Sequence, residues 1–139
     1  MSDLQTVRPL ATSPLIAFLA TADPARSRQF YEGVLQLRLV SEDPFATVFD
    51  CNGTMLRVQK VDAVSSVSYT SLGWQTDDIA QLVQELGHRG VQPERYEGLQ
   101  QDELGIWTSP GGAKVAWFKD PDGNVLSLTQ FALSTEGRT

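Results

Sequence analysis

The sequence has little of what builds several kinds of chemical site. Its 139 residues include one cysteine, Cys51, and one histidine, His88. A single cysteine excludes a disulfide within the chain and fits a reducing compartment, so we expect a cytoplasmic protein. A single histidine excludes, within one chain, an iron site built from two histidines and a carboxylate.

Basic residues and long apolar runs are scarce as well. The chain has 11 Lys and Arg against 17 Asp and Glu, a net charge of −6. That balance argues against nucleic acid, whose backbone needs clustered cations. The longest apolar segment, PLIAFLA, is far shorter than the roughly 18 residues of a membrane span. We expect neither partner, and the length and the 41% hydrophobic content predict one domain, 1–139.

Two helices are predicted from their capping residues. DPARSRQFYEGVL begins with Asp23 as N-cap and Pro24 at the first helical position. DDIAQLVQELGHRG begins at Asp77 or Asp78, has apolar residues at helical spacing and stops at Gly90. The remaining apolar segments read as strands, and each half ends in a hairpin with an Asn-Gly or Asp-Gly turn. The expected strands are 14–21, 37–42, 45–50, 55–61, 69–76, 91–97, 105–109, 113–119 and 125–131.

The order of these elements is an internal repeat, with module one at about 14–61 and module two at about 67–131. Aligning the two N-caps and the two turn glycines, Gly53 and Gly123, pairs Arg57 with Ser127. The second half is longer by 15 residues, which fall in the polar stretch ERYEGLQQDELG. We expect a mobile loop at 94–104 over a site, and whether it closes on a ligand stays open.

The segments DPARSRQFYEGVLQL and FKDPDGNVLSLTQ together resemble the vicinal oxygen chelate superfamily, which includes glyoxalase I, bleomycin-resistance proteins and extradiol dioxygenases. The resemblance implies an α+β fold, in which two βαβββ modules form a cup-shaped mixed sheet with helices outside and the ligand site inside. It also implies a homodimer, which exposed sheet edges favour too. The modules would close one cup within a chain, or pair across the dimer to form two sites.

The resemblance further implies four metal-binding positions, which fall on Ile16, Arg57, Ser71 and Ser127. An alkane, a guanidinium and two neutral hydroxyls are unsuited to a divalent ion. We therefore expect no metal and no other cofactor. The single histidine excludes extradiol dioxygenase chemistry, and the four positions argue against metal-dependent glyoxalase chemistry. No catalytic residue is assigned: His88 ends a helix outside the cup, and the Asp50 carboxylate beside Cys51 raises the pKa of a thiol.

The predicted ligand-binding residues combine apolar and aromatic walls with polar groups that orient a ligand. Arg57 anchors an anionic group or pairs with an acid such as Glu103, and the tryptophans pack the sheet or stack on a flat or cationic ligand. The predicted set is Ile16, Phe18, Arg57, Ser71, Gln75, Trp107, Trp117 and Ser127.

Three functions stay open at this point. The first is metal-independent binding, or sequestration, of a small organic molecule. The second is a glyoxalase- or lyase-type enzyme with an atypical or metal-free site. The third is a non-catalytic structural or regulatory subunit with a vestigial cup.

Overall fold

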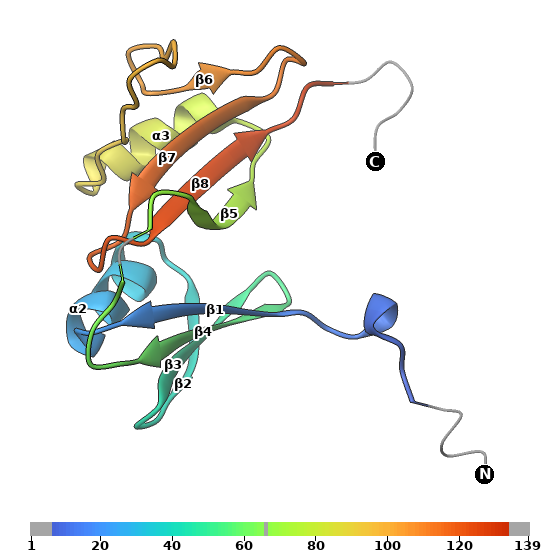
Figure 1. Cartoon of the computed structure of the whole chain (residues 1–139), viewed down its shortest axis with the longest axis vertical. Coiled ribbons are helices and arrows are strands. Elements are labelled where there is room, and N and C mark those ends of the chain that lie inside the picture. The colour runs from blue at the N-terminus through green and yellow to red at the C-terminus, as the bar shows by residue number, and fades with distance from the viewer. Residues whose placement is uncertain (1–6, 66, 134–139) are drawn as a thin grey trace.

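The computed structural model describes residues 7–65 and 67–133, which fold into two four-stranded sheets with helices on one side of each. Figure 1 shows the sheets one above the other, with the first half of the chain below and the second half above. Both sheets are mixed, because each contains one parallel and two antiparallel strand pairs. The α+β fold class predicted from the sequence is confirmed.

Module one has the strand order β1-β4-β3-β2, with a helical segment between β1 and β2. Asp23 caps this segment as predicted: its carboxylate accepts a hydrogen bond from Arg26 N at 3.3 Å, and Pro24 follows the cap. Its second half is a π-helix, in which Leu35 N donates to Phe30 O at 2.9 Å. The elements are η1 (Leu10–Thr12), β1 (Ile16–Thr21), α2 (Pro24–Arg28), η2 (Gln29–Val34), β2 (Arg38–Glu42), β3 (Ala46–Cys51) and β4 (Thr54–Lys60).

Module two repeats this layout with the strand order β5-β8-β7-β6. Asp78 is the N-cap of its helix, and Gly90 follows the helix with a φ of 91°, a conformation that glycine adopts without strain. The elements are β5 (Thr70–Gln75), α3 (Ile79–His88), β6 (Trp107–Thr108), β7 (Lys114–Lys119) and β8 (Val125–Gln130).

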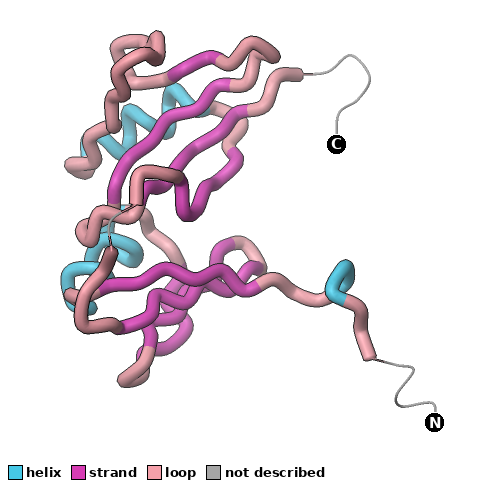
Figure 2. Tube along the Cα trace, in the orientation of Figure 1, coloured by secondary structure: helices cyan, strands magenta, loops and turns pink. Residues whose placement is uncertain are grey.

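The predicted strand at 91–97 is wrong, and the one at 105–109 is reduced to the two residues of β6. Figure 2 shows the long stretch between α3 and β6 as loop. One ladder-like hydrogen bond is present, from Glu94 N to Trp117 O at 2.7 Å. Pro93 cannot donate a backbone hydrogen bond, and the residues after Glu94 bond within the loop, so the ladder does not extend.

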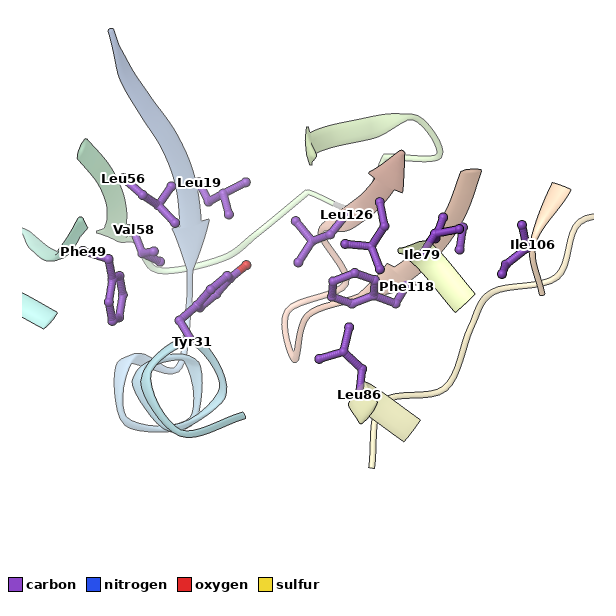
Figure 3. Packing of buried hydrophobic residues seen from close by; sticks show 12 residues of the cluster. Leu19, Tyr31, Phe49, Leu56, Val58, Ile79, Leu86, Ile106, Phe118 and Leu126 are labelled. Atoms are coloured by element: carbon purple, nitrogen blue, oxygen red, sulfur yellow. The ribbon is translucent and has the colours of Figure 1, made fainter. Parts of the chain in front are cut away.

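The hydrophobic core lies on the helix side of both sheets. Along β1 and β4, buried residues alternate with half-buried or exposed ones, because successive side chains of a strand point to opposite faces. Figure 3 shows Tyr31 and Phe49 of module one and Phe118 and Leu86 of module two within one cluster. We call the opposite face of each sheet, away from the helices, its inner face.

A buried hydrogen-bond network joins the two modules. Tyr31 of η2 donates its hydroxyl to Asp120 Oδ2 at 2.6 Å, and Asp120 lies in the turn between β7 and β8. Asn124 of the same turn donates Nδ2 to Ala20 O at 3.0 Å, and Asp122 Oδ1 accepts from the backbone N of residue 22 at 2.9 Å. Burial and then the Asp120 charge raise the pKa of Tyr31 above its ordinary value, so the phenol remains a donor.

In the described part of the chain, no helix has the length and apolar character that crossing a membrane requires.

Candidate functional site

The eight predicted ligand-binding residues lie on strands, and their side chains belong to the inner faces. Residues paired directly across strands share a face. Phe18 pairs with Arg57, and Ser127 pairs with both Gly73 and Trp117. Strand alternation and pairing place the other four predicted residues on the same faces: Ile16, Ser71, Gln75 and Trp107. Their contact with a ligand remains a prediction.

We call the cross-strand neighbours at the centre of each inner face its middle row. The middle rows of the two modules differ in the size of their side chains. In module one the row carries Phe18, Arg57 and Val48, so its side chains are large or long. In module two the row runs through Gly73 and Ser127 to Trp117. Two small residues beside a tryptophan form a low floor next to a wall.

The floor is closely fitted at Gly73. A Cβ atom added there would lie 2.4 Å from Ser127 Oγ and 3.3 Å from Ser127 O. Ser127 itself is 9% exposed, and within the described residues its hydroxyl makes no hydrogen bond. Among the described residues, the side-chain atoms that are fully buried without a partner belong to Ser27, Thr47 and Asp122, so the Ser127 hydroxyl keeps some access to solvent.

The wall is a cluster of three aromatic rings. Trp117 lies edge-to-face with Tyr96, with ring centroids 5.4 Å apart and planes at 84°. Trp117 also contacts Trp107, with ring centroids 6.2 Å apart and planes at 35°. All three side chains are half-buried, so part of each ring surface stays open. The sequence gives Tyr96 only a weak signal, because it lies in a polar loop without periodicity.

The loop that carries Tyr96 is held by its own hydrogen bonds. The Gln101 side chain accepts from Tyr96 N at 2.8 Å and donates to Glu94 O at 2.9 Å and Gly105 O at 2.8 Å. The Arg95 guanidinium donates to the carbonyls of residues 102 and 103 at 2.9 and 2.8 Å. Sequence reasoning missed Gln101, because a lone glutamine in a loop has no distinguishing pattern. The structure gives the predicted mobile loop an ordered framework, while its closure on a ligand remains a prediction.

Arg57 is half-buried on the inner face of module one. Among the residues described, it has neither an ion pair nor a hydrogen bond, so the alternative pairing with Glu103 is not present. The charge of Arg57 acts on the Asp43 carboxyl. Backbone donors at Phe45 and Ala46 lower the pKa of Asp43, and the charges of Arg57 and then Lys60 add smaller effects.

The four positions that the resemblance assigns to metal ligands do not fit a metal. Ile16 and Arg57 offer no donor atom to a cation, and Ser71 and Ser127 offer only neutral hydroxyls. Within 7–65 and 67–133, no group of three or more His, Cys, Asp and Glu side chains could hold an ion. His88 is the exposed last residue of α3, as the sequence predicts.

Cys51 lies at the end of β3 and is half-buried. Burial, followed by the charge of Asp50, raises the pKa of its thiol above the ordinary value. The sequence predicted this direction from Asp50 alone, whereas burial is the larger cause. A thiol with a raised pKa is a poor nucleophile at neutral pH.

The arrangement of paired modules defines a class of fold seen in many solved structures. Lactoylglutathione lyase from Agrobacterium tumefaciens matches with a TM-score of 0.68 and 16% identity over 88% of this chain and 96% of that chain. TioX from Micromonospora sp. ML1 matches with a TM-score of 0.64 and 18% identity, over 86% of this chain and 99% of that one. A superfamily member from Sphaerobacter thermophilus DSM 20745 reaches a TM-score of 0.67 and 22% identity, over 86% and 97%. At these identities the likeness shows the fold alone.

The sequence itself shows the family. The model of the Glyoxalase/Bleomycin resistance protein/Dioxygenase superfamily matches residues 13–128, so the chain belongs to that superfamily. The resemblance inferred from the sequence is confirmed. No curated protein matches the chain in sequence.

Proposed function

We propose that the protein binds a small organic molecule on its inner faces without using a metal. The observation that carries the proposal is the Ser127 hydroxyl, which is 9% exposed and makes no hydrogen bond within the described residues. A ligand atom beside Ser127 would form a hydrogen bond with this hydroxyl in place of the water that it can still reach. The neighbouring aromatic wall supplies apolar contact area, which gives affinity in small-molecule sites. Sequestration is the simplest outcome of such binding.

From Arg57 we infer that the proposed ligand carries an anionic group. The guanidinium faces the inner side of module one and lacks an internal ion pair among the described residues. A guanidinium holds a carboxylate, sulfonate or phosphate through two parallel hydrogen bonds. We therefore assign the charged end of the ligand to module one.

We further propose that a second copy of the chain covers part of module one. Ile16 and Phe18 are 46% and 53% exposed, and Met55 beside them is also exposed. Neighbouring apolar side chains on an open sheet face are typical of an interface. The proposal leaves both arrangements of the modules open. A molar mass of one chain from light scattering at micromolar concentration would contradict it, and a mass of two chains is expected.

The binding proposal is tested with an anionic aromatic probe, 2-naphthalenesulfonate, titrated by calorimetry into protein purified without added metal. We expect binding in the presence of a chelator. Arg57→Gln should weaken binding about tenfold or more, because a charge-assisted hydrogen bond contributes about 1.5–3 kcal/mol. The matched control is Arg26→Gln, which makes the same change of charge at an exposed residue on α2.

Two outcomes would contradict the proposal. One is a calorimetric titration in which the probe does not bind to the natural protein. The other is a stoichiometric divalent ion in native mass spectra of the purified protein, combined with loss of binding when that ion is removed.

A further inference from the structure

We infer that the aromatic wall of module two selects a ligand with a flat ring, and that Gln101 is the positioning residue that sets this selectivity. This inference rests on the proposed function and adds the class of ligand to it. It involves binding only and no covalent step. Three features of module two carry it: the geometry of the rings, the floor beside them and the hydrogen bonds that hold Tyr96.

The rings form a corner rather than a packed stack. Tyr96 lies almost perpendicular to Trp117, at 84°, while Trp107 is tilted from it by 35°. Both centroid distances, 5.4 and 6.2 Å, lie in the range where aromatic pairs attract. Each ring retains open surface, so a third partner can add another edge-to-face or offset contact. A flat ring matches such surfaces over its whole area, whereas a puckered ring does not.

The floor beside the wall is low, because two of the three residues in its row are small. Trp117, Ser127 and Gly73 occupy one row across β7, β8 and β5. Of these, only the tryptophan rises far above the sheet. A Cβ at Gly73 would come within 2.4 Å of Ser127 Oγ, so the serine hydroxyl covers the glycine. A ring lying on Ser127 would contact the indole edge of Trp117 and the serine hydroxyl, which makes no hydrogen bond among the described residues.

Gln101 fixes the position of Tyr96 through the backbone. Its Oε1 accepts from Tyr96 N, and its Nε2 donates one hydrogen to Glu94 O and the other to Gly105 O. The amide thereby uses both of its hydrogens and ties together the two ends of the loop. At the far end Gly105 has a φ of 84°, and a Cβ added there would lie 2.7 Å from Pro93 Cβ, so this position requires glycine. The position of Tyr96 relative to Trp117 therefore depends on Gln101, five residues later in the chain.

The amide is hard to replace. A glutamate at this position keeps the shape and can still accept from Tyr96 N. It then directs a second oxygen at two carbonyl oxygens, where Gln101 had donated two hydrogen bonds. Repulsion between these oxygens should separate the two ends of the loop and move the Tyr96 ring away from Trp117.

The test uses two probes with the same anionic group, 2-naphthalenesulfonate and cyclohexanesulfonate, each titrated by calorimetry. The natural protein should bind the flat probe at least about tenfold more tightly, from two or more aromatic contacts. Gln101→Glu should weaken the flat probe about five- to tenfold and leave the puckered probe unchanged. Gln100→Glu, the same change at the exposed neighbouring residue, should alter neither.

A second pair of variants keeps the test valid if Gln101→Glu fails to fold. Tyr96→Phe retains the ring and should bind as the natural protein does, since no hydrogen bond to the Tyr96 hydroxyl is present in the described chain. Tyr96→Ala removes the ring and should lose selectivity for the flat probe.

The outcomes separate this inference from the proposed function. Equal affinity for both probes in the natural protein would overturn the flat-ring inference while leaving ligand binding intact. A parallel loss of both probes in Gln101→Glu, with a lowered melting temperature, would assign Gln101 a purely structural role and overturn the positioning inference. If neither probe binds to the natural protein, the proposed function itself fails.

Discussion

The two modules share one plan but distribute bulk and charge in opposite ways. In module one the middle row of the inner face holds Phe18 and Arg57, and its edge strand is apolar and exposed. In module two the same row begins with Gly73 and Ser127 and ends at Trp117. The helix-facing sides differ far less, since both contribute Leu and Phe residues to one cluster.

This contrast shows which side of the fold is constrained by packing. A residue on the helix side must fill space against the helix, and core substitutions that change volume are costly. Residues on the inner face do not pack against a helix, so their chemistry can differ between the halves, although Gly73 and Ser127 fit each other closely. We assign the charged end of the ligand to module one and its ring to module two on that basis.

The connection between the modules also differs between the two halves, because it uses the turn of module two. Removing Asp120 from that turn gives the largest loss of stability that we predict. Asp120, three residues before the turn glycine, accepts hydrogen bonds from the Tyr31 hydroxyl, from the side chain and backbone of Asn124 and from Asp122 N. Asp120→Ala leaves these donors without a partner, several of them buried. We expect a loss of about 3 kcal/mol in the free energy of unfolding, measured by urea denaturation.

The matched control is the aspartate at the same point of module one. Asp50 also stands three residues before its turn glycine, yet its interaction is a 3.6 Å ion pair with the exposed Arg38. Asp50→Ala should cost less than about 1 kcal/mol. Equal losses in the two variants would contradict the view that the turn of module two, and not that of module one, holds the modules together.

The sequence was sufficient for the parts of the fold that repeat. Periodicity and capping residues located both helices, because these signals depend on neighbours in the chain; they predicted the N-cap Asp23 and left the second N-cap as Asp77 or Asp78, of which the structure has Asp78. Strand alternation places the eight predicted residues on the inner faces, and their contact with a ligand remains a prediction. It could not give the junction between Tyr31 and Asp120, which are 89 residues apart, because no local pattern encodes that contact.

The loop before β6 is the part that the sequence described wrongly. Residues 91–97 have a composition compatible with a strand, but the side chain of Gln101 takes the backbone groups that a neighbouring strand would use. The contact of Tyr96 with Trp117 follows from that loop and has only a weak signal in the sequence. Tertiary hydrogen bonding here overrides local propensity.

The second prediction concerns the floor of module two and has an intermediate effect. Gly73→Ala places a Cβ against Ser127 Oγ at 2.4 Å, so we expect a loss of about 1–3 kcal/mol from strain. Adding Ser127→Ala should restore much of the loss, because the nearest remaining atom is then the carbonyl oxygen at 3.3 Å. Urea denaturation of the two single variants and the double variant measures this coupling.

A glycine in open space provides the control for the floor. Gly87 lies within α3 and has no neighbouring atom within 4 Å of an added Cβ. Gly87→Ala should stabilise the protein by about 0.5–1 kcal/mol, since alanine is the better helix former. Additive effects of Gly73→Ala and Ser127→Ala, without rescue, would show that the floor is not closely fitted.

The smallest predicted effect returns to the turn of module one. The pKa of the Cys51 thiol is raised by burial first and by the Asp50 carboxylate second. A raised pKa reduces the thiolate fraction at pH 7–8, so alkylation by iodoacetamide should be slow and should accelerate as the pH rises. Asp50→Asn removes only the smaller cause, and we expect about a twofold faster reaction, in line with the weak interactions of exposed charges. Mass spectrometry of the alkylated protein over a series of pH values gives the rate.

A slower reaction in Asp50→Asn would mean that the ion pair with Arg38, rather than the charge of Asp50, governs the reactivity of the thiol. The two aspartates would then differ in their partners and not only in their burial.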